Sequence, residues 1–571
     1  MKNSRLKVLR VGVALTFFAG LLALLLGKTV WVPVVAVQWL AAVQFVPSLV
    51  AFATGVTASF AFIVILVASL LAGRIYCAAI CPLGILQDVV GRLSAWLSRK
   101  KRLRRFVRVS VWPRQVFLWG TVAGVAAGWS GLALTLTDPY SNFGRIASLL
   151  FRPFLQVLGR LVFGLVHLAG SPVASGEPVL WGGFGVLAVP AFVLTLVVAM
   201  EVYRERFYCN SVCPVGTLLG LFSKWSAYRV TIDSQACRKC GECAGVCKAQ
   251  CIDLRRGVID GSRCVACFNC LGVCDSNAIS YGFTWRRKPR VKTTLRPTEQ
   301  AAAAADPQRR AFLSATVVAA VSAAGASKVF GMVESRSLTP QLESREKRIG
   351  PITPPGAGGT ERLLERCTAC QLCVSACPTQ VLRPAFLEYG VAGFAKPRLD
   401  FTTASCDFGC RRCGEVCPDG AIGPLALAEK QVTRIGMAHF EPAKCRNLTK
   451  GFVCTLCVDH CPTKALALTP DQEGLCLPRF QPLLCIGCGA CEHVCPVRPT
   501  KAITVLGRRI HNRARKAVDQ GAIASLLSPH GSTQRVREPA LTSNDLNPHE
   551  PFTAAGENLT ALVTLSGNRP G

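Results

Sequence analysis

The sequence predicts a multidomain protein in which an α-helical bundle of four membrane spans precedes two separate cysteine-rich α+β domains. Half of the 571 residues are hydrophobic, and the apolar residues are clumped as membrane spans require. The 30 cysteines fall mainly in two distant blocks with short, regular spacings. Such spacings are typical of thiolate ligands rather than of a secreted disulfide scaffold. A chain of this length has room for three or four domains.

The larger cysteine block, residues 367–495, contains four groups of four cysteines, and each group ends in Cys-Pro. The first and fourth groups have the C-x2-C-x2-C-x3-C-P spacing of bacterial ferredoxins, in which three thiolates bind one 4Fe–4S cluster and the fourth binds its neighbour. The second and third groups lengthen only the first gap. Zinc is the less favoured alternative, because zinc sites usually combine two Cys pairs, often with His. The expected ligands are Cys367, Cys370, Cys373, Cys377, Cys406, Cys410, Cys413, Cys417, Cys445, Cys454, Cys457, Cys461, Cys485, Cys488, Cys491 and Cys495.

A second cysteine block, within residues 231–285, predicts a two-cluster ferredoxin-like unit. Lys248 and Asp275 stand where proline usually follows the fourth cysteine. Cys251 occupies a position where alanine usually sits, and it lies outside the quartets, as does Cys476. If the ligands cross over, the last cysteine of each quartet completes the other cluster. The expected ligands are Cys237, Cys240, Cys243, Cys247, Cys264, Cys267, Cys270 and Cys274.

The first 230 residues predict the membrane domain. We expect spans over residues 11–26, 55–73, 116–136 and 180–200, and an apolar segment at 30–54 that lies at the outer face or dips into the bilayer. Residues 145–170 predict an amphipathic segment on the outer surface. The arginine- and lysine-rich loop at residues 99–108 is expected in the cytoplasm, which puts both ends of the bundle there.

Two near-copies of one motif flank this bundle. Residues 73–84 and 205–216 share the pattern Arg-x-Tyr-Cys-x3-Cys-Pro-x-Gly. The repeat predicts two equivalent halves whose thiols converge on a candidate redox or metal site. The alternative is a helix-turn packing motif with small buried thiols. The four residues concerned are Cys77, Cys81, Cys209 and Cys213.

The two cysteine blocks are expected on opposite sides of the membrane. Residues 286–305 predict a basic, alanine-rich linker. Residues 306–333 predict a twin-arginine export signal at Arg309-Arg310 or, alternatively, a fifth span. Residues 334–506 are then a periplasmic four-cluster domain, and residues 507–571 a polar tail.

A net charge of +32 is also typical of proteins that bind nucleic acid, which is an alternative interpretation of this sequence. No recognition motif supports it. Six clusters would also reduce the charge to about +20, because an oxidised 4Fe–4S cluster with four thiolates carries about −2.

On these motifs, residues 1–290 resemble NapH and residues 306–506 resemble NapG, two components of periplasmic nitrate reductase systems. The resemblance implies a multi-pass protein of the bacterial inner membrane that takes electrons from quinol and passes them to a periplasmic redox enzyme or cytochrome. Its partners would be membrane lipid and the quinone pool. The chain has no evident haem, nucleotide or nucleophile–base motif, so no catalytic residue is assigned. The alternatives are a membrane ferredoxin that assembles, reduces or regulates a metalloenzyme, and a passive scaffold.

The six quartets supply 24 cysteine ligands. We therefore predict six 4Fe–4S clusters, or about 24 iron atoms per chain. Anaerobic iron and sulfide analysis of the purified protein measures this number. A value near half would mean that some quartets are empty or hold zinc.

Overall fold

The structure is a computed structural model that describes residues 2–27, 32–55, 60–97, 106, 111–167, 184–284, 350–450, 453–470 and 476–515. The linker at 286–305, the Arg309-Arg310 pair, nearly all of the basic loop and most of the predicted tail lie outside these residues. The predictions made for them therefore stay predictions. Residues 1–517 form one compact unit.

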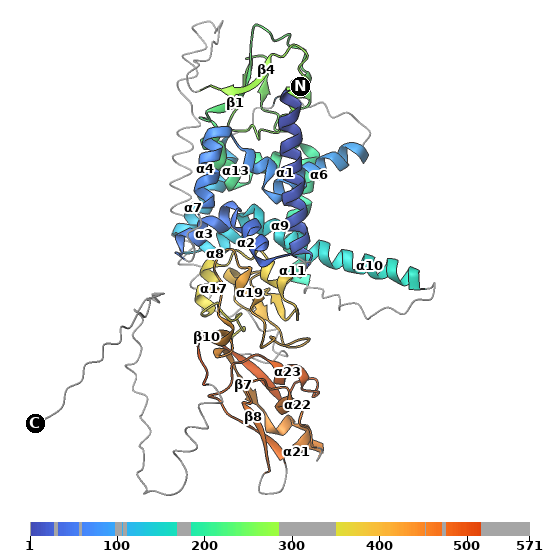
Figure 1. The fold of residues 1–571 in the computed structure, drawn as a ribbon, viewed down its shortest axis with the longest axis vertical. Coiled ribbons are helices and arrows are strands. Elements are labelled where there is room, and N and C mark those ends of the chain that lie inside the picture. The colour runs from blue at the N-terminus through green and yellow to red at the C-terminus, as the bar shows by residue number, and fades with distance from the viewer. Residues whose placement is uncertain are drawn as a thin grey trace, which may run out of the picture. The chain divides into compact units, whose positions relative to one another are not determined.

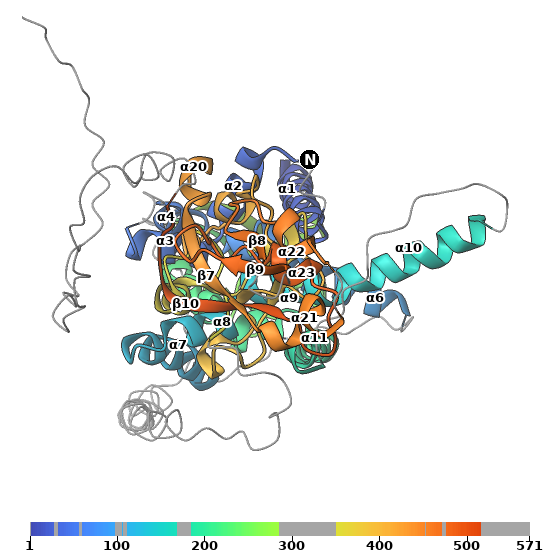
Figure 2. The same cartoon turned by 90° about the horizontal axis from the view of Figure 1, so that it is seen from below.

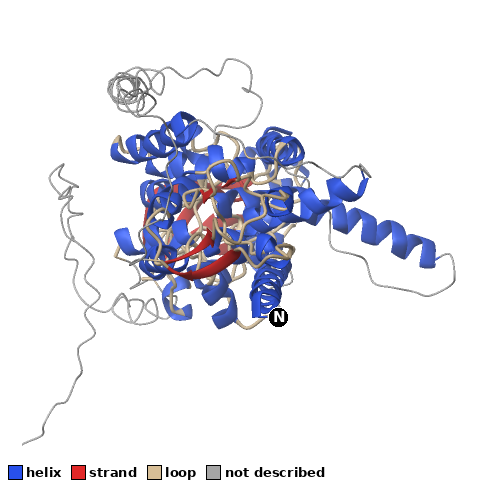
Figure 3. Ribbon diagram, turned by 90° about the horizontal axis from the view of Figure 1, so that it is seen from above, coloured by secondary structure: helices blue, strands red, loops and turns tan. Residues whose placement is uncertain are grey.

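Helices make up most of the first half of the chain, as Figures 1 and 3 show. Two of them, over Arg5–Leu25 and Gly185–Tyr203, are long and apolar enough to cross a membrane. A bent pair, with 92° between its two helices, would be a third if it forms one broken or re-entrant span. The elements are α1 (Lys2–Leu25), the bent pair α2 (Val34–Ala42) and α3 (Phe45–Ala53), α4 (Ala61–Ala72), α5 (Ile75–Ala79), α6 (Pro82–Leu97), α7 (Val111–Ala126), α8 (Ser130–Thr137), α9 (Pro139–Arg145), the π-helix η2 (Ile146–Phe151), α10 (Arg152–His167), α11 (Phe184–Tyr203), α12 (Phe207–Ser211) and α13 (Pro214–Ser223).

The four-span prediction is met only in part. The predicted span at 55–73 contains α4, which has 12 residues and ends at Gly73, where φ is 82°. The predicted span at 116–136 is divided between α7 and α8, and Gly128, with φ of 83°, lies between them. Left-handed backbone of this kind favours glycine and ends a helix. A Cβ on Gly131 in α8 would lie 2.1 Å from the Leu364 carbonyl oxygen, so α8 packs on the C-terminal domain instead of continuing α7.

The repeated motif builds two matching helical segments. In the first, α4 leads into α5 and α6; in the second, α11 leads into α12 and α13. The leading helix of each segment packs on the last helix of the other, because α4 contacts α13 and α11 contacts α6. Because each segment packs on the other, the two halves of the bundle are interdependent.

The two-cluster unit contains two antiparallel strand pairs and two short helices. Strand β1 (Tyr228–Ile232) pairs with β4 (Ile279–Phe283), with Val230 opposite Tyr281. Strand β2 (Ile252–Asp253) pairs with β3 (Val258–Ile259). The short helices are α14 (Glu242–Gly245) and η3 (Asn269–Gly272).

The C-terminal domain repeats this construction around three further strand pairs: β5 with β6, β7 with β10 and β8 with β9. The strands of the last two pairs are labelled in Figure 2. Strand β10 continues to Arg513 and pairs there with Thr433 of β7, so the domain extends beyond the predicted boundary at residue 506. Backbone pairing holds these polar residues, which is why side-chain pattern did not reveal them. The elements are α17 (Thr360–Arg366), α18 (Leu372–Ala376), β5 (Leu382–Pro384), η4 (Val391–Gly393), β6 (Pro397–Leu399), α19 (Arg412–Glu415), α20 (Leu427–Lys430), β7 (Thr433–Phe440), η5 (Pro442–Lys444), α21 (Arg446–Lys450), α22 (Leu456–Asp459), β8 (Leu466–Pro470), β9 (Cys476–Phe480), α23 (Ala490–Val494) and β10 (Ile503–Arg513).

Both cysteine-rich parts contact the helical bundle. On the two-cluster side, the Ser223 hydroxyl donates to the Gly261 carbonyl at 2.9 Å, and the Tyr281 hydroxyl donates to the Ala72 carbonyl at 3.0 Å. On the other side, the Ser375 hydroxyl donates to the carbonyl of Leu25, the last residue of α1, at 2.9 Å. The bundle therefore contacts two cysteine-rich parts that are distant in sequence.

A buried carboxylate fastens the two-cluster unit to the bundle. Asp88 in α6 forms ion pairs with Arg10 at 2.8 Å, Arg206 at 2.8 Å and Lys248 at 3.0 Å. Burial acts to raise the pKa of Asp88, but the charges of Arg206 and Lys248 outweigh it and lower the pKa. Lys248 is the residue found where proline was expected, and this ion pair gives a physical reason for the departure.

We predict that Asp88→Asn loosens the two-cluster unit, because removing one partner of a buried ion pair typically costs about 3–5 kcal/mol. Asp275→Asn is the matched control, since Asp275 follows the other fourth cysteine but is exposed. Limited proteolysis and thermal unfolding, followed by cluster absorbance, measure the difference. Because the pKa of Asp88 is lowered, its contribution is present above the ordinary aspartate pKa of about 3.9 and is lost as the pH falls through the folded value. Equal stability of the two variants would contradict the prediction.

Candidate iron–sulfur sites

The three-cysteine loops share an unusual backbone. In the loop that begins at Cys367, the residues on either side of the second cysteine, Ala369 and Gln371, have φ of 58° and 66°. The loop of the fourth group places Gly487 and Gly489 at the same two positions, also with positive φ. Left-handed residues at both positions wind the loop tightly, so that its three sulfurs face one point. Lys239, Gly241, Ala266 and Phe268 repeat the pattern in the two-cluster unit.

The groups with a longer first gap use a different loop. In the second group Arg411, just after Cys410, has φ of −132°, and in the third Thr455, just after Cys454, has φ of −106°. The altered spacing therefore corresponds to an altered backbone, while the cysteines still gather as described below.

In the two-cluster unit the fourth cysteine of each sequence group lies with the first three cysteines of the other group. Burial raises the pKa of the Cys270 thiol, and the nearby thiols of Cys267, Cys264 and Cys247 raise it further. These four side chains line one cavity, whose remaining walls include Val230, Ile252 and Phe268. The other set consists of Cys243 with its neighbours Cys237, Cys240 and Cys274.

The first two groups of the C-terminal domain show the same exchange. The neighbours of the Cys373 thiol include Cys367, Cys370 and Cys417, and those of the Cys413 thiol include Cys406, Cys410 and Cys377. The resulting sets are Cys367, Cys370, Cys373 with Cys417, and Cys406, Cys410, Cys413 with Cys377.

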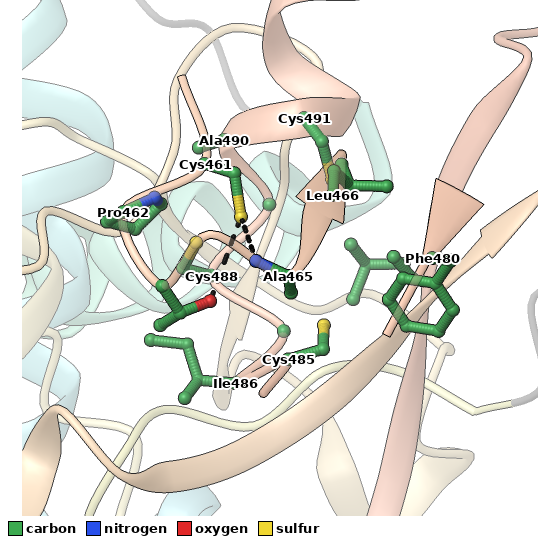
Figure 4. Close-up of a pocket in the computed structure, with 15 residues that line it drawn as sticks. Cys461, Pro462, Ala465, Leu466, Phe480, Cys485, Ile486, Cys488, Ala490 and Cys491 are labelled. Atoms are coloured by element: carbon green, nitrogen blue, oxygen red, sulfur yellow. Dashed lines mark hydrogen bonds between the residues drawn. The ribbon is translucent and has the colours of Figure 1, made fainter. Parts of the chain in front are cut away.

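The last two groups also exchange their fourth cysteines. Cys461 of the third group points into a cavity with Cys485, Cys488 and Cys491 of the fourth, as Figure 4 shows. Its sulfur accepts a hydrogen bond from the Ala465 backbone N–H at 3.3 Å. The complementary set is Cys445, Cys454, Cys457 and Cys495.

These cavities fit iron–sulfur clusters. The four thiols of one set line the walls of each of the two cavities described above, with apolar side chains between them, and Cys251 adds a fifth thiol to the cavity of the two-cluster unit. Backbone N–H groups also point at ligand sulfurs, from Ala369 to Cys367 and from Ile422 to Cys417, both at 3.4 Å. Such bonds stabilise the negative charge of a cluster. Among the described residues, no three His, Cys, Asp or Glu side chains are grouped closely enough to hold a single metal ion.

The four sets of the C-terminal domain form a row. Cys373 and Cys413, from the first two sets, are electrostatic neighbours. The Cys406 N–H donates to the Cys488 carbonyl at 3.0 Å, which joins the second set to the set in Figure 4. Cys457, in the last set, is a neighbour of Cys491. The set containing Cys370 lies at the end of the row that meets the helical bundle, because a Cβ on Gly144 of α9 would lie 2.2 Å from the Cys370 carbonyl oxygen.

The structure brings the four thiols of the repeated motif together. Cys77, Cys81, Cys209 and Cys213 are each 4–5 % exposed. All four lie outside the long helices. Burial raises the pKa of the Cys81 thiol, and Cys77, Cys209 and Cys213 raise it further. We call this group the four-thiol site.

Two arginines hold the halves of the four-thiol site together by reciprocal hydrogen bonds. Arg206 donates to the Cys77 carbonyl at 2.8 Å, and Arg74 donates to the Cys209 carbonyl at 3.1 Å. A Cβ at Gly84 or Gly216 would lie 2.4 Å from the Cys77 or Cys209 carbonyl oxygen, respectively. The glycine that ends each copy of the motif is therefore required by close backbone approach. The repeated sequence contains both arginines, but it does not reveal that each one donates to a cysteine carbonyl of the other copy.

Polar hydrogens also point at sulfur within the four-thiol site. The Gln87 amide donates to the Cys209 sulfur at 3.2 Å, and the Gly216 N–H donates to the Cys213 sulfur at 3.3 Å. Arg74 Nη2 lies 4.0 Å from the Cys77 sulfur. Sequence reasoning missed Gln87. It lies on the first turns of α6, six residues after Cys81, and nothing in the motif marked it.

The four-thiol site has cysteine sets on two sides. Ala78, next to Cys77, packs in a small buried group with Val265 and Cys267 of the two-cluster unit. On the other side, Tyr208 is an electrostatic neighbour of Cys209, Cys213 and Asp138. Tyr140, near Asp138, is in turn a neighbour of Cys370 and Cys417.

The fold and these sites define an iron–sulfur electron-transfer protein of the ferredoxin type. A family described as a 4Fe-4S binding domain matches residues 54–104 and 186–232, the two ranges that contain the four-thiol site. Two families described as 4Fe-4S dicluster domains match residues 360–423 and 450–499.

Curated relatives agree with this class. The ferredoxin-type protein NapF of Escherichia coli is 30% identical over 146 residues, which are 26% of this chain and 80% of NapF. NapG of Escherichia coli is 31% identical over 27% of this chain and 70% of its own length. The methylamine utilization protein MauM of Methylophilus methylotrophus is 32% identical over 37% of this chain and 92% of its own length. The chain belongs to this family of ferredoxin-type proteins. No solved structure matches it.

The exchange of fourth cysteines predicts which ligand losses are redundant. Cys373→Ser with Cys417→Ser alters one set, so we expect the double variant to lose about four iron atoms, no more than either single variant. Cys413→Ser with Cys417→Ser alters two sets and should lose about eight. Iron and sulfide analysis distinguishes these results. The reverse order of losses would mean that each sequence group holds its own cluster.

Proposed function

We propose that this chain is a membrane-bound electron conduit in which the four-thiol site joins the two iron–sulfur parts. The observation that carries the proposal is the position of this site beside cysteines of both parts: Ala78 packs with Cys267, and on the other side Cys209, Cys213, Tyr208, Tyr140 and Cys370 belong to one buried cluster. A 4Fe–4S cluster supplies one-electron transfer at a potential set by burial and by hydrogen bonds to its sulfurs. Six quartets and the four-thiol site would then form a continuous series of redox centres.

The charges around the four-thiol site support an anionic cofactor there. Arg74 and Arg206 are both fully buried, at 0 % exposure. Arg74 donates to neutral oxygens of Asn210, Ser262 and Cys209. A buried cation is costly without a nearby negative charge, so thiolates that hold a redox or metal centre would stabilise this arginine.

We further propose that the donor is quinol, that the acceptor is a periplasmic redox enzyme or cytochrome, and that the chain lies in the bacterial inner membrane with its C-terminal domain in the periplasm. The apolar helices α1 and α11, the basic loop after the first repeat and the contact of the two iron–sulfur parts with different regions of the bundle support this arrangement. The resemblance to quinol dehydrogenase components supports the donor.

The test uses Cys77→Ser with Cys209→Ser in the anaerobically purified chain. We expect a quinol analogue to reduce the clusters of the parent at least about tenfold faster than those of the double variant, because the joining centre is lost, while the six quartets keep their iron. Cys476→Ser is the control, since this cysteine lies outside every set.

Normal reduction in the double variant would return Cys77, Cys81, Cys209 and Cys213 to a packing role. Multiple turnovers with a soluble electron acceptor would separate a conduit from an assembly factor. An assembly factor is needed only while its partner enzyme is built, and it has no reason to turn over quinol.

A further inference from the structure

A fifth cysteine lies inside one of the cluster cavities. Cys251 is 1 % exposed and lines the same cavity as Cys247, Cys264, Cys267 and Cys270. Its sulfur lies 3.6 Å from that of Cys247, within hydrogen-bond range for sulfur. It therefore touches one of the four thiols that would hold this cluster and shares the cavity with the other three.

The chain itself provides the comparison for this position. The residue four places after the fourth cysteine is Cys251 here, but it is alanine in three other quartets: Ala278, Ala421 and Ala465. At the equivalent position Ala465 lies against the Cys461 sulfur, to which it donates its backbone N–H. The change from alanine to cysteine at residue 251 adds one S–H group, which lies within hydrogen-bond range of the Cys247 sulfur.

We propose that Cys251 is a positioning residue that donates its S–H to the Cys247 thiolate and thereby raises the reduction potential of the cluster that this thiolate holds. The proposal rests on cluster binding by this quartet. Reduction adds one electron to the cluster and its thiolates, and no proton moves. A hydrogen bond to sulfur stabilises the more negative, reduced state more than the oxidised state.

The higher reduction potential matters for electron transfer because of where this cluster lies. Cys267, a member of the same set, packs against Ala78 beside the four-thiol site, whereas the set of Cys237, Cys240, Cys243 and Cys274 has Ala278 at the equivalent position. Cys251 therefore makes the cluster nearest the four-thiol site the higher-potential member of the pair. At equilibrium an electron in this unit resides next to the four-thiol site rather than at the far cluster.

The test is a potentiometric titration of the full-length, anaerobically purified chain, followed by electron paramagnetic resonance. We expect Cys251→Ala to keep its iron and to lower the midpoint potential of one cluster, by a factor of about three to ten in the reduction equilibrium constant, or about 30–60 mV for one electron. Cys251→Ser should hold the potential at or above the parental value, because a hydroxyl is the stronger donor.

Ala278→Cys is the matched gain-of-function variant, and it should raise the potential of the other cluster. It also keeps the proposal testable if Cys251→Ala folds poorly. Unchanged potentials in Cys251→Ala and Ala278→Cys would overturn the proposal. A loss of about four iron atoms in Cys251→Ala would also overturn it, because Cys251 would then be a ligand. Chemical mediators set the potential in this experiment, so its outcome is separate from that of the quinol assay.

Discussion

The reciprocal hydrogen bonds of Arg74 and Arg206 are the interaction on which the arrangement of this protein depends. Each guanidinium extends from one copy of the repeated motif to a cysteine carbonyl of the other. A buried guanidinium is costly unless its donors are satisfied, so each arginine favours the assembled pair over the separate halves. The four thiols converge because these two contacts hold their loops against one another, and the glycines at 84 and 216 allow the approach.

The same arginines connect the helical bundle to the two-cluster unit. Arg74 also donates to the Ser262 carbonyl of that unit at 3.1 Å, and Arg206 shares Asp88 with Lys248. The network that assembles the four-thiol site therefore also fixes the nearest cluster set beside it. In an electron-transfer protein this is a useful coupling, because the separation of redox centres and the order of the site depend on the same buried charges.

The two iron–sulfur parts use the same ligand exchange for different purposes. In the two-cluster unit the exchange ties two sequence groups into one small fold, which packs on the bundle through Cys267. In the C-terminal domain two such exchanges occur in succession, and the Cys406–Cys488 backbone contact links them into a row. Cys251 shows that the copies have diverged where one added thiol alters the surroundings of a single cluster.

The sequence by itself contained the cysteine quartets and the repeated motif, and it predicted the cluster ligands and the order of the domains. Loop spacing and the Cys-Pro endings are local features, and a local backbone of three to eight residues is enough to aim several sulfurs at one point. Which quartets share their fourth cysteine within residues 367–495 was left open, because every group presents the same ending and only packing selects its partner. The convergence of Cys77 with Cys209, the ion pair of Lys248 with Asp88, and the cavity that Cys251 shares with Cys264, Cys267 and Cys270 bring together residues that are far apart in the chain or on different loops. The length of the spans was also decided by tertiary structure, since α8 is apolar enough to resemble the end of a membrane helix but is held against Leu364 of the C-terminal domain. Hydrophobicity records that a segment avoids water, and it does not record whether lipid or protein covers it.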